Sequence, residues 1–352
     1  MAEIVQADYQ TKLSLTQGAE EYRKLRNVVT EKKILDRAYG YYAFAGAVIL
    51  AGILATGYLI SISKNYFLLA VFGLAFAFFV GQIGGFMHDA GHRAIFKTKT
   101  MNDIVGSICA SVLFLNYRAW TTKHNFHHAH PNQEGKDPDI ELPLFAFTHK
   151  RYNSKKGIQS MVQRYQAWLH LPMSCLLAYT MQFKGNIKYF INEFKKGFRP
   201  GLIPEIAVFL VFLFVWYVLP FLLFPAVKAI FLIICVPVGV GFYLANIFAP
   251  NHKGMPELAH DAQVSFLEQQ IMTSRNVRSS LATDIIYFGL HYQIEHHLFP
   301  NCPRNKLKLI TPYIHELCQK FGLTYTDAGV FESVKIILGE LNKTAKAAAN
   351  SH

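Results

Sequence analysis

The sequence predicts an all-helical membrane protein with four transmembrane helices arranged as two hairpins, and three observations lead to this prediction. Hydrophobic residues make up 52% of the 352 residues and charged residues only 16%, whereas charged residues form about a quarter of an average soluble domain. The apolar residues gather in long runs, as membrane spans require. The lysines and arginines lie almost entirely outside those runs.

The first hairpin is predicted from two apolar runs at 41–62 and 66–87, separated only by Ser63, Lys64 and Asn65. Each run has about the 20 residues that an α-helix needs to cross the hydrocarbon core. The second hairpin is predicted at 205–224 and 226–249. Pro220, Pro225 and Lys228 interrupt the apolar block between these two spans, where a turn is expected.

The distribution of basic residues predicts the orientation of the spans. Four spans place 33 of the 35 lysines and arginines on one side, and only Lys64 and Lys228 lie at the two short connections on the other side. By the positive-inside rule, the segments 1–40, 88–203 and 250–352 are cytoplasmic, together with both termini. We interpret the net charge of +12 as favouring contact with an anionic membrane surface. No basic patch with interleaved aromatic residues indicates binding to nucleic acid. We expect one domain over 1–352.

Three histidine clusters lie in these cytoplasmic segments and carry seven of the 15 histidines. They are His88-Asp-Ala-Gly-His92, His124-Asn-Phe-His127-His128 and Gln293-Ile-Glu-His296-His297. Positions i, i+3 and i+4 share one face of a helix, so each cluster can direct its imidazoles at one point. A single pair of this kind can be a coincidence or a structural site, but three clusters on one side of a membrane predict metal binding.

The number and kind of ligands narrow the choice of metal. Imidazole suits zinc, copper, iron and nickel, and seven nitrogen ligands exceed the four of a structural zinc site, which indicates two ions. The zinc-protease pattern HExxH is absent because Asp89 follows His88, and the five cysteines form no CxxC pair. An imidazole-rich iron site with exchangeable positions suits oxygen activation.

The order of the clusters HDAGH, HNFHH and QIEHH, with spans before the first and between the second and third, resembles the membrane fatty acid desaturase family. The runs from His124 to Ile140 and from His291 to Arg304 are especially similar to it, and Gln293 resembles the third box of front-end and related acyl-lipid desaturases. The resemblance covers about Tyr41 to Pro303. It implies four spans beneath a cytoplasmic helical cap that carries two iron ions.

The resemblance also implies roles for individual residues. His252, directly after the fourth span, is expected as a further ligand, and Gln293 as a weak one. Asn246 and Asn251 are candidates for holding a metal-bound water, while Asp89, Asp137, Asp139 and Glu295 are candidates for orienting the ligands. The other histidines are interpreted as outer or surface residues: His130, His149, His170, His260, His291 and His315.

The activity implied is oxygen-dependent desaturation of a fatty acyl chain, presented as an acyl lipid or acyl thioester. No HPGG haem motif occurs, so electrons are expected from a separate donor, either ferredoxin or cytochrome b5. Two alternatives stay open. A di-iron hydroxylase of a fatty acid, alkane or sphingoid chain shares the boxes. A membrane metal transporter or binding protein predicts ionisable residues inside the spans, and the spans hold almost none.

Overall fold

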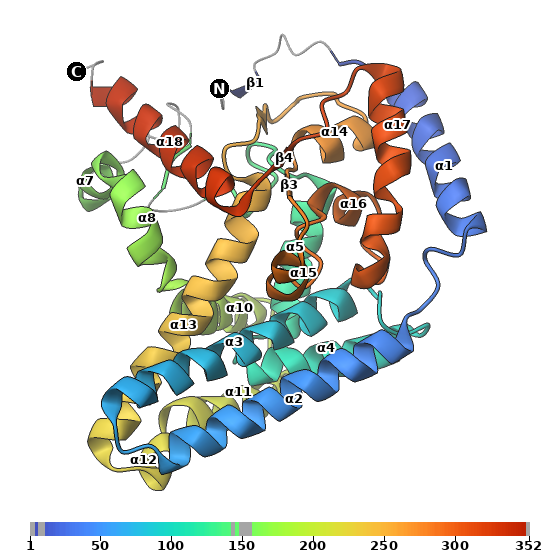
Figure 1. The fold of residues 1–352 in the computed structure, drawn as a ribbon. Helices are drawn as coiled ribbons and strands as arrows, with labels where there is room; N and C mark the ends of the chain where they lie inside the picture. Colours follow the sequence, from blue (N-terminus) through green and yellow to red (C-terminus); the bar gives the residue numbers. More distant parts are fainter. Residues whose placement is uncertain (1–3, 6–10, 142–144, 148–156, 350–352) are drawn as a thin grey trace. The chain divides into compact units, whose positions relative to one another are not determined.

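The computed structural model describes residues 4–5, 11–141, 145–147 and 157–349, and these ranges are helical apart from two short pairs of strands (Figure 1). The chain divides into two compact units. The first unit comprises Met1–Asp36, Lys123–Pro172 and Ile247–His352, and the second comprises Arg37–Thr122 and Met173–Asn246. Because each unit collects segments that are far apart in the sequence, the division does not follow a linker.

The second unit contains the long apolar helices. Its elements are α2 (Tyr39–Ile62), α3 (Tyr66–Gly91), α4 (Lys99–Val112), the start of α5 (Tyr117–Ala129), α9 (Leu177–Tyr179), the π-helix η1 (Thr180–Gly185), α10 (Asn186–Lys195), α11 (Leu202–Tyr217), α12 (Leu219–Leu223) and most of α13 (Ala226–His252).

The first hairpin forms as predicted, with α2 and α3 packed side by side (Figure 1). The side-chain oxygen of Asn65 accepts the backbone N–H groups of Phe67 and Leu68 at 2.8 and 3.2 Å, so it caps the start of α3. A Cβ atom at Gly52 would lie 2.4 Å from the Phe79 ring, so glycine is needed for this close approach. Helix α3 ends at Gly91 rather than at 87, and the first histidine cluster therefore begins inside the helix.

Three helices of the described residues are long and apolar enough to cross a membrane, namely α2, α3 and α13. The span expected over 205–224 is not one helix, because α11 has 16 residues and ends at Tyr217, and α12 has only five. Pro220 explains the break, since it has no N–H to donate to the carbonyl of Trp216 one turn earlier. Apolar character was predicted correctly here, whereas helix continuity was not.

The first unit holds most of the polar helices and all the strands. Its elements are β1 (Ile4–Val5), α1 (Leu15–Glu31), the end of α5, α7 (Ile158–Arg164), most of α8 (Gln166–Ser174), the end of α13, β2 (Glu257–Leu258), α14 (Phe266–Met272), β3 (Asn276–Val277), α15 (Leu281–Ile286), α16 (Gln293–Leu298), the 3-10 helix η2 (Arg304–Leu309), α17 (Thr311–Phe321), β4 (Asp327–Ala328) and α18 (Val330–Ala349). Strands β1 and β2 pair in parallel, as do β3 and β4.

A buried apolar cluster fixes the position of α16 inside the first unit. Helix α1 contributes Leu25 and Val29, α14 contributes Leu267, and α16 contributes Ile294 and Leu298. Burial of such aliphatic side chains is worth roughly 1.5–3 kcal/mol each before entropy is counted. The short helix α16, which has only six residues, is therefore held by its packing and not by its own helical propensity.

Candidate metal centre

Three buried histidines of the first unit direct their Nε2 atoms at one another. His127 comes from α5, His252 from the end of α13 and His297 from α16. The Nε2 atom of His252 lies 3.2 Å from that of His127 and 3.0 Å from that of His297. All three side chains are at least nine-tenths buried. Segments that are far apart in the sequence thus bring three ring nitrogens to one point.

The outer nitrogen of each ring has an acceptor, and this fixes the state of the inner one. Nδ1 of His127 lies 3.0 Å from Asp137 Oδ2, Nδ1 of His252 lies 3.0 Å from the carbonyl oxygen of Thr273, and Nδ1 of His297 lies 2.8 Å from Gln270 Oε1. These oxygens can only accept, so each Nδ1 carries the proton and donates it. With Nδ1 as the donor, each ring can present its Nε2 lone pair toward the other two.

Converging lone pairs fit a bound cation. Two ligand atoms that each lie about 2.1 Å from one ion are roughly 3.0 to 3.4 Å apart, which matches the observed 3.0 and 3.2 Å. Nitrogen donors with outward hydrogen bonds to carboxylate and carbonyl groups are the usual surroundings of a metal-ligating histidine. The donor set of this trio, all imidazole, suits iron, zinc, copper or nickel.

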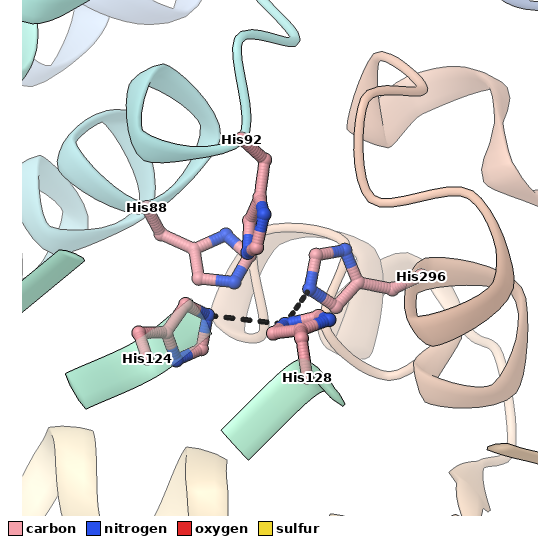
Figure 2. A group of neighbouring side chains, drawn as sticks. All are labelled: His88, His92, His124, His128 and His296. Atoms are coloured by element: carbon pink, nitrogen blue, oxygen red, sulfur yellow. Dashed lines mark hydrogen bonds between the residues drawn. The ribbon is translucent and has the colours of Figure 1, made fainter. Parts of the chain in front are cut away.

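A second trio forms beside the first, on α5 and α16, two of the three helices that carry the first trio. Nε2 of His128 lies 3.1 Å from Nε2 of His124, one turn earlier in α5, and 3.1 Å from Nε2 of His296 in α16. Figure 2 shows these two contacts as dashed lines, with the His128 ring between the other two. The i, i+4 spacing in α5 brings the first pair together, as the sequence predicts. The rings of His128 and His297 stack at 4.2 Å, so the two trios are neighbours.

The first cluster of the sequence lies at the end of α3 in the second unit. The ring centroids of His88 and His92 are 4.8 Å apart, and both side chains are drawn in Figure 2. Asp89 Oδ1 lies 3.1 Å from Nδ1 of His88, and Asp89 Oδ2 accepts the hydroxyl of Tyr42 at 2.8 Å. The predicted orienting role of Asp89 thus has a matching contact.

Asp137 is the best-placed of the predicted orienting residues. It is fully buried, and it also accepts the backbone N–H groups of Asn132 and Asp139, at 2.8 Å each. Burial by itself raises the pKa of this carboxyl, but the His127 ring outweighs burial and holds the pKa below its usual value. The two carboxylate oxygens of Asp137 thus accept hydrogen bonds from His127, Asn132 and Asp139. His127, Asp137 and Asp139 also form a possible metal group by distance, but in each of the contacts given above Asp137 is a hydrogen-bond acceptor.

The carboxylate of Asp139 has a different partner. It pairs with the ammonium group of Lys123 at 2.5 Å and lies 3.8 Å from Nδ1 of His127. Burial raises the pKa of Asp139, but the opposite effect of Lys123 and His127 is larger, so the pKa lies below its usual value. Asp139 therefore adds negative charge near His127 without replacing Asp137 as the hydrogen-bond acceptor.

Glu295 ties α16 to neighbouring segments through buried hydrogen bonds. It is fully buried, and its oxygens accept from Asn276 Nδ2 at 2.7 Å, from the Tyr325 hydroxyl at 2.6 Å and from Thr311 Oγ1 at 2.8 Å. These three partners were not predicted, and nor was Gln270. They come from β3, from α17, from the segment before β4 and from α14, and nothing in the local sequence marks them as neighbours of the boxes.

The predicted amide residues differ in their surroundings. Asn251 Nδ2 donates to Gln293 Oε1 at 2.9 Å, and Gln293 Nε2 lies 2.9 Å from Nε2 of His252. The structure thus brings both residues to the first trio. Asn246 donates instead to the Phe242 carbonyl at 2.7 Å and to Ser174 Oγ at 3.4 Å, within the second unit.

The remaining histidines have other contacts where the structure describes them. Nδ1 of His130 lies 3.1 Å from Gln133 Oε1, Nδ1 of His260 lies 3.1 Å from the Glu134 carbonyl, Nε2 of His291 lies 2.8 Å from Asp284, and the rings of His170 and His315 pack on Phe145 and Tyr325. These contacts are with residues outside the two trios. His149 lies outside the described residues.

Comparison with known proteins identifies the family of this chain. The model of the family described as fatty acid desaturase matches residues 65–329. The chain is 26% identical over 345 residues to an acyl-lipid (9-3)-desaturase of Physcomitrium patens, covering 95% of this chain and 64% of that protein. It is 28% identical over 348 residues to a Delta(8)-fatty-acid desaturase of Euglena gracilis, covering 95% and 81%. A Delta(6)-fatty-acid desaturase of Caenorhabditis elegans is 28% identical over 349 residues, covering 93% and 75%.

Proposed function

Because this chain belongs to the fatty acid desaturase family, we propose that it introduces a double bond into a fatty acyl chain, using oxygen and a histidine-ligated di-iron centre. The single observation that carries this proposal is the convergence of the Nε2 atoms of His127, His252 and His297 at 3.0–3.2 Å, with every Nδ1 engaged outward. A metal ion placed between the three rings would use all three Nε2 lone pairs.

The proposed ligand sets follow the two trios. One iron is held by His127, His252 and His297 with Gln293, and the other by His124, His128 and His296. We propose that His88 and His92 complete the second set, because their ring nitrogens form one possible metal group with those of His124, His128 and His296. The absence of thiolate and the small share of carboxylate favour iron over a structural zinc site.

When bound, the iron pair supplies oxygen activation and the removal of one hydrogen from each of two adjacent methylene carbons. Oxygen, two electrons and two protons then balance the formation of one double bond and two waters. The residues of the chain fix the geometry. Asp137, Thr273 and Gln270 hold the protons on the outer ring nitrogens, so that the inner nitrogens stay available as ligands. Glu295 fixes the helix from which His296 and His297 project.

We propose a topology of four spans in two hairpins with a cytoplasmic helical cap, and we treat 1–352 as one desaturase domain. The third span would comprise α11 and α12 together, in spite of the break near Val218. The distribution of basic residues supports this arrangement, since 33 of 35 would lie on the cytoplasmic side. Helices α5 and α13 each continue from one compact unit into the other, which favours one domain.

For the partners, we propose a fatty acyl substrate, held as an acyl lipid or acyl thioester, and a separate electron-transfer protein. The substrate proposal rests on what the relatives are named for. The donor, ferredoxin or cytochrome b5, is proposed because the 352 residues contain no HPGG haem motif. The excess of basic residues could attract an acidic carrier.

The proposal is tested by expressing the chain in a host and profiling the host's lipids, alongside metal analysis of the purified protein. We expect an acyl chain with one additional double bond, and about two iron ions per chain. The variant His128→Ala should remove the product and lower the iron content. A hydroxylated product would assign the chain to hydroxylation instead. Stoichiometric zinc without iron, after growth in iron-replete medium, would rule out the redox function.

A further inference from the structure

A buried pair of amide side chains adjoins the first histidine trio. Asn251 precedes His252 at the end of α13, and Gln293 begins α16. Their side chains are 1% and 6% exposed. Asn251 Nδ2 donates to Gln293 Oε1 at 2.9 Å, which leaves the Gln293 amide nitrogen 2.9 Å from Nε2 of His252. The amide nitrogen of Gln293 therefore faces the point where the ring nitrogens converge.

Metal binding at His252 would conflict with this arrangement. The proton of His252 is on Nδ1, which donates to the Thr273 carbonyl, so Nε2 of His252 is an acceptor and can take an N–H from Gln293. A metal ion uses the same lone pair. The amide N–H of Gln293 would then point at a cation and at a nitrogen with no free lone pair. Such a donor, buried and unpaired, would destabilise the metal-bound site.

Both amides can remove this conflict by turning end for end. An amide group exchanges its oxygen and nitrogen by a half-turn, with almost no change in shape. If Gln293 turns, its Oε1 faces the trio and its Nε2 faces Asn251. Asn251 must then accept, and it has the means, because Asn251 Oδ1 is buried and has no hydrogen-bond partner among the described residues. Its backbone stays fixed, since the Asn251 carbonyl accepts the N–H of Arg275 at 2.8 Å.

We propose that Asn251 and Gln293 are an inverting amide pair, in which Asn251 is the positioning residue that turns the oxygen of Gln293 toward the iron ion. The terminal atom of Gln293 is already at ligand spacing, 2.9 Å from Nε2 of His252, so the inversion needs no movement of the backbone. Gln293 thus becomes an oxygen ligand in a site otherwise built from imidazoles. This inference rests on the proposed metal site and specifies how its third box works without a histidine at 293.

The test uses substitutions that fix the direction of the hydrogen bond. In Asn251→Asp, residue 251 can only accept, so Gln293 is held with its oxygen inward, and we expect iron affinity within about threefold of wild type. In Gln293→Glu, a carboxylate faces both the iron and the Asn251 amide nitrogen, and iron should again be retained. Combining the two places carboxylate oxygens against each other, and affinity should fall about 10–100-fold, as for loss of a partner that orients a ligand.

The measurement is iron affinity by chelator competition, with melting temperatures of the iron-free variants as a check on folding. Asn251→Leu can neither donate to Gln293 nor accept from it, and should lower affinity about 10–100-fold. Asn305→Asp, at an exposed position, controls for added charge and should change nothing. If Asn251→Leu does not fold, the Asp and Glu series decides the question alone.

Two outcomes would overturn the inverting pair. One is an Asn251→Asp variant that loses as much affinity as Asn251→Leu. The other is a double variant that binds iron as well as the two single variants, because the direction of the hydrogen bond would then not matter. Failure of the proposed function looks different, since wild-type protein would then hold no iron in the same assay.

Discussion

Oδ2 of Asp137 lies 3.0 Å from Nδ1 of His127, and neither side chain is more than 4% exposed. The pair connects α5 with the loop that follows it, and it sets the tautomer of His127. Burial alone lowers the pKa of His127, but Asp137 and Asp139 outweigh burial and raise it. The carboxylate therefore stabilises positive charge at this ring, whether a proton or a metal ion supplies it.

Asp137→Asn should weaken iron binding without unfolding the protein. An asparagine keeps one oxygen, which cannot serve His127 Nδ1 and the backbone N–H groups of Asn132 and Asp139 together. His127 would lose its fixed tautomer, and we expect iron affinity to fall about 10–100-fold. Chelator competition measures the effect. Asp261→Asn, at an exposed position, is the matched control, and equal loss in both variants would contradict the role of Asp137.

The contact between Tyr325 and Glu295 leads to a prediction about stability. Burial and the charge of Glu295 both raise the pKa of Tyr325, so its hydroxyl stays protonated and donates to Glu295 at 2.6 Å. Tyr325→Phe removes that donor from a fully buried carboxylate, at a cost of about 1–3 kcal/mol. We expect a lower melting temperature and weaker iron binding, because α16 is then less firmly held.

The control for this change is Tyr313→Phe in α17. Tyr313 packs on the same apolar cluster, but its hydroxyl makes no hydrogen bond among the described residues, so its removal should be nearly neutral. A Tyr325→Phe variant that keeps the wild-type melting temperature and its iron would show that this hydrogen bond to Glu295 does not matter for the site.

The sequence predicted the histidine groups because their geometry is mostly local. His124 and His128 meet through one helical turn, and the HDAGH pair does the same in α3. Asp137 was one of four acidic candidates for orienting a ligand, and it lies 3.0 Å from Nδ1 of His127. These are contacts that helical periodicity and short loops determine.

Long-range partners of the site could not be predicted in the same way. Gln270 reaches His297, and Tyr325 reaches Glu295, only because α14, α16 and β4 pack together. Each is an ordinary polar residue in a short segment with no periodic pattern. The break between α11 and α12 was missed for another reason. Hydropathy reports whether a segment suits a membrane, whereas Pro220 decides whether one helix runs through it.

The proposed topology predicts that both chain ends face the cytoplasm. An even number of spans keeps 33 of the 35 basic residues on one side, whereas three spans would divide them. A reporter that is active only in the cytoplasm should therefore be active when it is fused after His352. Activity of a reporter that works only on the far side would contradict four spans and would indicate that α11 and α12 do not cross.

The prediction for His252 is the most informative, because this ligand lies outside the three boxes. Its Nε2 is within 3.2 Å of the corresponding atoms of His127 and His297, and its Nδ1 is bound to Thr273. His252→Ala removes one of three lone pairs from the first trio. We expect iron affinity at that trio to fall by at least about 100-fold, more than for an orienting partner, and product to disappear with it.

The matched control for His252→Ala is His260→Ala, eight residues further along the chain. His260 is exposed, and its Nδ1 lies 3.1 Å from the Glu134 carbonyl, so loss of the ring should leave both iron and product unchanged. Measuring iron and product together matters, since a surface histidine affects neither and a ligand affects both. If His252→Ala keeps full iron occupancy and normal turnover, His252 is not a ligand, and the trio would need another donor in its place. The nearest such group is Gln293, whose amide is already 2.9 Å from the position that His252 Nε2 occupies.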